Sequence, residues 1–232
     1  MMSKLFVVTF ARGGSKGLSN KNIKLLNGKP LLTYSLNVAK ELANVEAVFV
    51  STDSGEIAKV AKQYNAQVIE RPSDLATDTA NEWDAWQHSV MYLKQNYNMQ
   101  DDDLFLSLPC TSPLRTKEDI EKLVSEFECS QADLALCVSE STRNPFFNMV
   151  TLNSDKYAQV VCDVGQFHRR QDVPPVFDIT TVGYVTTAQF VLAADSVLSG
   201  STLGVEIPKS HSVDIDDQCD FDFAEVLIKR RG

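Results

Sequence analysis

The stretch Phe6-Val7-Val8-Thr9-Phe10-Ala11-Arg12-Gly13-Gly14-Ser15-Lys16-Gly17, which leads to Lys21-Asn22, decides the fold. Its apolar, β-branched first half predicts a buried strand, and its second half predicts a loop with three glycines and two cations. Glycines let several N–H groups point at one place, which makes a concave anion site. Arg12, Lys16 and Lys21 add full charges, as a bound triphosphate requires. The alternative is a glycine-rich surface turn with solvated lysines.

Two better-known phosphate-binding loops are excluded by their spacing. A Walker A loop needs Gly-Lys-Ser/Thr, whereas the order here is Ser15-Lys16-Gly17. A dinucleotide fingerprint needs G-x-G-x-x-G at the start of a helix, whereas this loop continues through Asn20-Lys21-Asn22-Ile23-Lys24. The loop therefore predicts an anion site of another kind.

The composition limits the class of protein. The 232 residues fit one domain with a small insertion, and 44% hydrophobic with 23% charged residues is ordinary for a globular protein. No apolar run approaches the roughly 20 residues of a membrane span, and the N-terminus has no signal-peptide pattern. Five cysteines without a C-x-x-C pair argue against disulfides and zinc and favour a reducing cytoplasm. The net charge of −9 argues against binding nucleic acid or anionic membranes.

Strand and helix patterns alternate along the chain. Strands are predicted at residues 5–10, 47–51, 67–69, 104–108 and 134–138, and helices at 31–42, 55–64, 80–95 and 117–129. Two of these helices begin with the capping-box patterns Thr79-x-x-Glu82 and Thr116-x-x-Asp119. This alternation predicts a single Rossmann-like α/β domain with three α/β/α layers and a mostly parallel sheet. Ligands of such sheets bind beyond the carboxyl ends of the strands.

The alternation stops between about residues 139 and 177. Short apolar pieces at 146–152 and 157–161 flank the turn residues Asn153-Ser154-Asp155, which predicts a hairpin-like insertion. Such a hairpin cannot bury Phe146-Phe147 by itself, so we expect it to pack against a second subunit. Regular structure resumes with a strand at 181–186, a helix from residue 188, a strand near 203–207 and a closing helix at about 219–229.

Polar motifs follow three further predicted strands. Asp53 fits a cap of the next helix better than a catalytic carboxylate. Arg71, which is fixed before Pro72, points to the functional edge of the sheet, and a surface ion pair is the alternative. The turn Pro109-Cys110-Thr111-Ser112-Pro113 presents two hydroxyls, although it could merely precede a helix.

A pair of carboxylates stands near the C-terminus. Asp214 and Asp216 lie two residues apart after an apolar strand, so in extended backbone they project to one side. Two such carboxylates repel each other unless a cation lies between them, and Mg²⁺ accepts one or two carboxylates with phosphate oxygens. Asp217 would face away and cap the last helix. An acidic cap cluster is the alternative for all three. Together with the glycine loop, the pair favours Mg-nucleotide chemistry.

These blocks resemble the acylneuraminate cytidylyltransferase family, the CMP-sialic acid synthetases, along nearly the whole chain. Six collinear blocks carry the resemblance: 11–17 with Lys21-Asn22, 50–53, Arg71-Pro72 with 75–79, 111–115, Arg170-Gln171 with Pro174, and 214–216. In that family, the anomeric hydroxyl of a 3-deoxy-2-ulosonic acid attacks the α-phosphorus of CTP. Pyrophosphate leaves and a CMP-sugar forms.

The resemblance implies a role for each matching residue. Arg12, Lys21 and Asp216 would be catalytic, and Asp214 and Asp216 would hold Mg²⁺, with Asp216 placed to assist deprotonation of the sugar hydroxyl. The implied nucleotide-binding residues are Ala11, Arg12, Gly13, Gly14, Ser15, Lys16, Lys21, Asn22, Arg71, Ala80, Thr111 and Ser112. The implied sugar-binding residues are Arg170, Gln171, Thr180 and Tyr184. The family also implies a homodimer in which the partner completes the sugar pocket.

Departures from the family pattern lie on the sugar side. Pro109-Cys110 replace the usual Gln-Pro before Thr111, and the usual Asn-Gly-Ala-Ile-Tyr block reads Thr180-Thr181-Val182-Gly183-Tyr184, which keeps only the tyrosine. The expected partners are thus CTP and a nine-carbon ulosonic acid such as a sialic, legionaminic or pseudaminic acid, or an eight-carbon octulosonate. A catalytically silent nucleotide-binding module is the remaining alternative, and the retained Asp214 and Asp216 argue against it.

Overall fold

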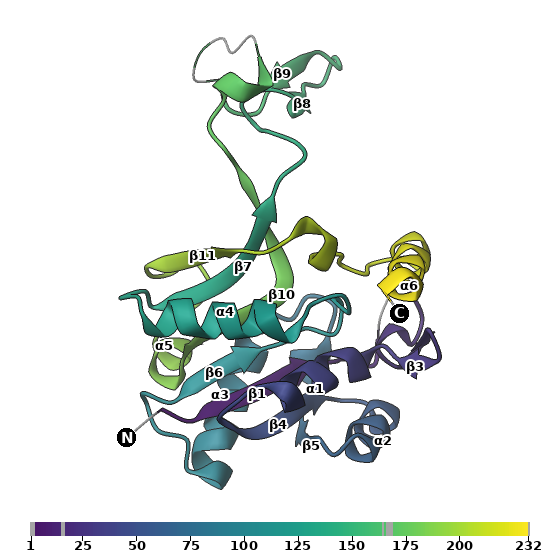
Figure 1. The fold of residues 1–232 in the computed structure, drawn as a ribbon, viewed down its shortest axis with the longest axis vertical. Helices are drawn as coiled ribbons and strands as arrows, with labels where there is room; N and C mark the ends of the chain where they lie inside the picture. Colours follow the sequence, from purple (N-terminus) through teal and green to yellow (C-terminus); the bar gives the residue numbers. More distant parts are fainter. Residues whose placement is uncertain (1–2, 15–16, 164, 166–168, 232) are drawn as a thin grey trace.

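A seven-stranded sheet forms the middle layer of the molecule (Figure 1). The computed structural model describes residues 3–14, 17–163, 165 and 169–231. In spatial order the strands are β11 (Thr202–Glu206), β7 (Leu134–Glu140), β10 (Phe177–Thr187), β6 (Leu104–Ser107), β1 (Leu5–Phe10), β4 (Val45–Thr52) and β5 (Gln67–Glu70). Strand β10 runs antiparallel to both of its neighbours, and the other six strands share one direction. The predicted mostly parallel sheet is confirmed.

Helices cover both faces of this sheet. Helices α1 (Leu32–Glu41), α2 (Gly55–Gln63) and α4 (Lys117–Glu128) pack on one face, and α3 (Glu82–Tyr97) and α5 (Ala188–Ala193) pack on the other. The alternation of side chains along the strands divides the core between the two faces, so that Val7 joins the α1 and α4 side and Phe6 joins the α3 side. The predicted α/β/α layering is therefore confirmed.

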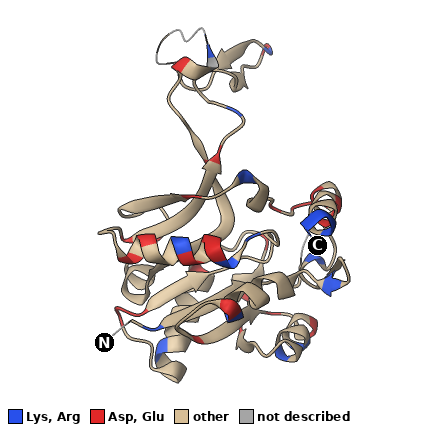
Figure 2. Ribbon diagram, in the orientation of Figure 1, with Lys and Arg blue, Asp and Glu red and all other residues tan. Residues whose placement is uncertain are grey.

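The last helix lies at the edge of these layers. Helix α6 (Gln218–Arg231) packs against a small hairpin of β2 (Leu25–Leu26) and β3 (Lys29–Pro30) (Figure 1). This hairpin was not predicted, although its Asn27-Gly28 turn has φ of 46° and 78°, as a type I′ turn needs. Both signs of charge occur on α4 and α6 (Figure 2). No helix of the described chain is long and apolar enough to cross a membrane.

One of the two predicted capping boxes is present. The Thr116 hydroxyl accepts the Asp119 N–H at 3.3 Å, and the Asp119 carboxylate accepts the Thr116 N–H at 2.8 Å. The predicted box at Thr79 is wrong, because α3 begins at Glu82 and Asn81 is its cap, with 3.1 Å from the Trp83 N–H to the Asn81 side-chain oxygen. Glu82 sits in the first turn and turns its carboxylate toward Trp86 instead of back to Thr79.

An arm, residues 141–176, extends from the ends of β7 and β10 and projects away from the layers (Figure 1). It contains a two-stranded antiparallel sheet of β8 (Val150–Leu152) and β9 (Ala158–Val160) and the short 3₁₀ helix η3 (Arg170–Asp172). Strand β10 starts at residue 177, earlier than predicted, because its first residues pair with the end of β7 and support the arm. The other 3₁₀ helices are η1 (Lys21–Ile23), η2 (Ser73–Ala76) and η4 (Lys209–His211).

Candidate active site

A cavity of about 580 Å³ opens at the carboxyl ends of β1, β5 and β6. The segments that follow these strands supply most of its lining, and β10 and the segment before α6 supply the rest. The lining residues that matter here are Arg12, Lys21, Asn22, Arg71, Ala80 and Asp216. The structure thus brings together residues from four of the six collinear sequence blocks.

The glycine loop is fastened at both ends. Its Gly13 N–H donates to the Asp53 carboxylate at 2.9 Å, and the Asn22 side-chain amide donates to the main-chain oxygen of Arg12 at 3.0 Å. The prediction that Asp53 caps α2 is wrong, since Ser54 is the cap and Asp53 holds the loop. Ala11 is buried and Gly14 is exposed, while the predicted ligands Ser15 and Lys16 lie outside the described residues.

Two cations of the loop face acidic partners. The Arg12 guanidinium pairs with the Asp78 carboxylate at 2.8 Å. The Lys21 ammonium donates to the main-chain oxygen of Ile215 at 2.5 Å and lies 3.5 Å from the Asp216 carboxylate. Lys21 therefore joins the glycine loop to the acidic segment, residues 214–217, although Lys21 and Ile215 are 194 positions apart in sequence.

Gly17 is required where the loop meets the acidic segment. A Cβ atom at this position would stand 2.3 Å from the main-chain oxygen of Asp216, a distance that no side chain tolerates. The third glycine of the motif therefore permits a close backbone approach, which brings Asp216 beside Lys21.

Arg71 is held rigidly on the opposite wall. Its guanidinium donates to the Ser51 hydroxyl at 3.1 Å and to the Ser51 main-chain oxygen at 2.8 Å, and it lies 5.4 Å from the centre of the Phe10 ring. Burial lowers the pKa of Arg71 from its ordinary value, and the Asp53 charge opposes this shift. Arg71 takes part in none of the ion pairs among the described residues, so the surface ion pair alternative is not what the geometry shows.

The hydroxyl groups after β6 meet β10. The Thr111 hydroxyl lies 3.2 Å and the Ser112 hydroxyl 2.7 Å from that of Thr181, and Thr111 and Thr181 line the cavity. Thr180 does not, because its hydroxyl donates to the main-chain oxygen of Cys137 at 2.9 Å in the core. The register of β10 against β7 shifts between Ile179 and Tyr184, and within this irregular stretch Thr181, in place of the predicted Thr180, lines the cavity.

Two further groups complete this side of the cavity. Tyr184 lines it, with its ring 5.6 Å from that of Trp86, and burial raises the pKa of its hydroxyl. Cys110 also lines the cavity, but burial raises the pKa of its thiol to about 12. The thiol therefore stays protonated at neutral pH and is no nucleophile.

A buried arginine below the cavity was not predicted as a site residue. Arg115 donates to the Ser35 hydroxyl at 2.7 Å and to the main-chain oxygens of Pro109 and Thr181 at 2.5 and 2.9 Å. Burial lowers its pKa to about 10, so it remains charged at neutral pH. Arg115 ties the turn after β6 to β10, and its place directly after the Pro-rich turn is the sequence signal for this support.

The three aspartates of the acidic segment differ in burial and in hydrogen bonding. One oxygen of Asp214 is buried without a hydrogen-bond partner among the described residues, whereas the Asp216 side chain is 82% exposed. Asp217 caps α6 as predicted, since its carboxylate accepts the Asp220 N–H at 3.0 Å. A buried carboxylate oxygen without a partner fits a cation ligand. The described residues hold no group of three or more potential metal ligands, and Mg²⁺ needs only one or two carboxylates when phosphates supply the rest.

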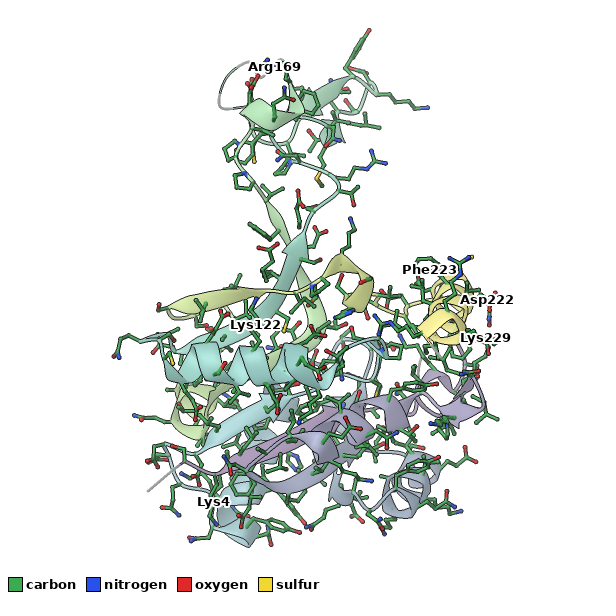
Figure 3. The ribbon with its side chains drawn as sticks, in the orientation of Figure 1. Lys4, Lys122, Arg169, Asp222, Phe223 and Lys229 are labelled. Atoms are coloured by element: carbon green, nitrogen blue, oxygen red, sulfur yellow. The ribbon has the colours of Figure 1, made fainter. Side chains whose placement is uncertain are left out.

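The predicted sugar-binding residues of the arm are not near this cavity in one chain. Gln171 lines a different hollow of about 280 Å³ along the arm, with Asn144 and Pro174. The side chain of Arg170 lies outside the described part of the structure, and its neighbour Arg169 is seen at the far end of the arm (Figure 3). Within one chain, the structure therefore separates Gln171 from Thr181 and Tyr184.

Comparisons with known proteins show the family of this chain. Residues 6–225 match the cytidylyltransferase family. The chain is 34% identical to the post-translational flagellin modification protein B of Campylobacter coli and 31% identical to the CMP-N,N'-diacetyllegionaminic acid synthase of Campylobacter jejuni, in both cases over 100% of this chain and 97% of the relative.

A solved structure supports the same fold. The CMP:2-keto-3-deoxy-manno-octonic acid synthetase complexed with CTP superimposes with a TM-score of 0.72 at 16% identity, covering 99% of this chain and all of the other. The sequence and the fold thus lead to one answer, and the chain is an enzyme of the cytidylyltransferase family, as its resemblance to the acylneuraminate cytidylyltransferases predicted.

Proposed function

We propose that this enzyme activates a 3-deoxy-2-ulosonic acid with CTP and releases pyrophosphate. The observation that carries the proposal is the single cavity in which Arg12, Lys21 and Arg71 surround a space that Asp216 also lines. A relative named as a CMP-N,N'-diacetyllegionaminic acid synthase supports a nine-carbon ulosonic acid as the substrate, and an eight-carbon acid is the second candidate.

The nucleotide would lie across the cavity. Arg12 and Lys21, with the N–H groups of the glycine loop and with Ser15 and Lys16, would neutralise the triphosphate. Asn22, Arg71 and Ala80 would contact the cytidine, and the rigid fastening of Arg71 to Ser51 would fix its position. Phosphoryl transfer needs positioning and charge neutralisation more than covalent chemistry, so such groups suffice.

The acidic segment would serve the attacking side. Asp214 and Asp216 would hold Mg²⁺, which neutralises phosphate charge when bound. The anomeric oxygen forms a bond to the α-phosphorus, the bond to pyrophosphate breaks, and Asp216 accepts the proton of the attacking hydroxyl. The 3.5 Å between the Lys21 ammonium and the Asp216 carboxylate supports this placement, because the ion pair holds Asp216 beside the proposed phosphate site.

A second copy of the chain would complete the sugar site. The arm exposes large apolar side chains that a two-stranded hairpin cannot bury, including Leu152 at 65% and Tyr157 at 73% exposure. We therefore propose a homodimer in which the partner's arm brings residues 170 and 171 to the cavity, where Arg170 would bind the sugar carboxylate. Free cysteines throughout the described chain fit the proposed cytoplasmic location.

One assay tests this function. Pyrophosphate release is measured with CTP, UTP, ATP and GTP, each combined with a panel of nine-carbon and eight-carbon ulosonic acids. We expect turnover with CTP and a nine-carbon acid. Turnover with none of the ulosonic acids would contradict the proposal, and a preference for the eight-carbon acid would replace the sugar while keeping the reaction.

A further inference from the structure

Glu82 places a carboxylate in the cavity that the proposed mechanism does not use. It is the first residue of α3, and it lines the cavity together with Arg71 and Tyr184. One carboxylate oxygen accepts the indole N–H of Trp86 at 3.3 Å. The other has no hydrogen-bond partner among the described residues.

The charge of Glu82 is not matched by a cation. No ion pair among the described residues includes Glu82, and the nearby Arg71 guanidinium is committed to Ser51. Although the residue as a whole keeps exposed surface, enclosure of its carboxyl group raises the pKa of Glu82, while the Trp86 hydrogen bond and the Arg71 charge lower it. The nearby Asp214 carboxylate raises it further. An unmatched acceptor held in a cavity is available to a ligand.

We propose that Glu82 is a specificity-determining residue whose carboxylate accepts a hydrogen bond from a donor group of a bound substrate. This inference rests on the proposed function. Two donors have the required chemistry, namely the exocyclic amino group of cytosine and an acylamino N–H or hydroxyl of the sugar acid. The charges of Arg71, on the proposed cytidine side, and of Asp214, on the proposed sugar side, both act on Glu82, so the test includes a donor from each substrate.

The indole of Trp86 makes the acceptor directional. Trp86 is buried, and its ring packs against Phe105 and Tyr184, with ring centres 5.4 and 5.6 Å apart. Its N–H therefore holds one carboxylate oxygen of Glu82 in place and leaves the other oxygen for the ligand. A pre-positioned acceptor discriminates against analogues that lack the donor, since the acceptor would then stay unpaired.

An acidic residue in the first turn of a helix can also stabilise that helix, and the test must distinguish this effect from contact with a substrate. Glu82 and Asp84 both lie in the first turn of α3, where negative charge stabilises a helix. Asp84 is exposed and does not line the cavity, so Asp84→Asn is a matched control for the helix effect.

The test compares Glu82→Leu, Glu82→Gln and Asp84→Asn with the wild type on matched substrates. The first comparison measures kcat/KM for CTP and for the triphosphate of the pyrimidin-2-one riboside, which lacks the exocyclic amino group. The second comparison measures kcat/KM for the best ulosonic acid and for counterparts with a single acylamino or hydroxyl group replaced by hydrogen.

In one of the two comparisons the wild type should prefer the donor-bearing substrate by about 10- to 150-fold, the range of a charge-assisted hydrogen bond. Glu82→Leu should abolish that preference, Glu82→Gln should weaken it, and Asp84→Asn should leave it unchanged. The comparison in which the preference changes identifies the donor group. An active enzyme whose preferences are the same in Glu82→Leu and the wild type would overturn the inference alone. Wild type that turns over no ulosonic acid would overturn the proposed function and this inference with it.

Discussion

The cavity and the arm are opposite kinds of surface. Polar groups in the cavity are largely engaged by one another, as when Lys21 holds the acidic segment and Arg71 is fixed to Ser51. Eight of the fourteen exposed large hydrophobic residues in the described chain lie between positions 149 and 179. None of the hydrophobic core clusters of the described chain includes a residue of the arm. The difference fits the proposal that one chain supplies the nucleotide site by itself, whereas the arm needs a second subunit to cover its apolar side chains.

The largest effect should come from the acidic segment of the cavity. Asp216→Asn should keep the fold, because the side chain is 82% exposed, but lower turnover by orders of magnitude. An amide ligates Mg²⁺ poorly and cannot take the proton of the attacking hydroxyl. Steady-state pyrophosphate release measures the effect. Asp217→Asn is the matched control, and a similar rate for both variants would remove Asp216 from the chemistry.

The glycine-loop cations should have the next largest effect. Arg12→Ala and Lys21→Ala should each weaken CTP-dependent turnover by about 10- to 150-fold, since each loses a charge-assisted contact of roughly 1.5–3 kcal/mol. Calorimetric titration with CTP, alongside kinetics, separates binding from turnover. Lys29→Ala, on the exposed β2–β3 hairpin, is the control. Unchanged CTP affinity and turnover in both loop variants would support the alternative, in which the loop is a surface turn that binds no phosphate.

Changes in the arm should leave the nucleotide site intact. Leu152→Ser combined with Tyr157→Ser should shift the protein from dimer to monomer without unfolding it, because neither side chain belongs to a hydrophobic core. Sedimentation velocity at micromolar concentration measures this, and Leu25→Ser on the β2–β3 hairpin is the control. CTP affinity should stay the same. A wild type that sediments as a fully active monomer would refute the assembly.

The smallest effect should be on stability alone. Thr116→Ala should lower the free energy of unfolding by about 1 kcal/mol, because the Asp119 N–H loses its capping oxygen. Thr79→Ala should change it little, since Asn81 is the cap of α3. Urea denaturation compares the two variants. Equal losses would show that the two helix starts do not differ as the hydrogen bonds indicate.

The body of the protein was predictable because each local signal agrees with its surroundings. The strand at Leu5–Phe10 begins and ends where its apolar run does, and Asp217 caps the last helix as expected. The errors arose where a distant partner takes over a local group. Asp53 binds the Gly13 N–H instead of capping α2. Thr181 rather than Thr180 lines the cavity, because the register of β10 shifts in this stretch and the Thr180 hydroxyl donates to the main-chain oxygen of Cys137.

Contacts between remote segments were beyond local patterns for the same reason. The approach of Gly17 to the main chain of Asp216 and the place of Glu82 in the cavity depend on how the layers pack. Neither follows from the spacing of residues along the chain. The sequence motif showed that residue 17 is a glycine, whereas only the packed structure shows that the main chain of Asp216 lies beside it.

Mixing two defective variants tests the central claim, that the cavity of one chain is completed by the arm of another. Asp216→Asn and Arg170→Ala are purified separately, then mixed under conditions that let subunits exchange, and pyrophosphate release is followed at low ulosonic acid concentration. If the arm acts on the partner, the mixed dimer contains one site with an intact cavity and an intact arm, so activity should rise well above the sum of the two parents. Activity that stays at that sum despite confirmed subunit exchange would contradict the account.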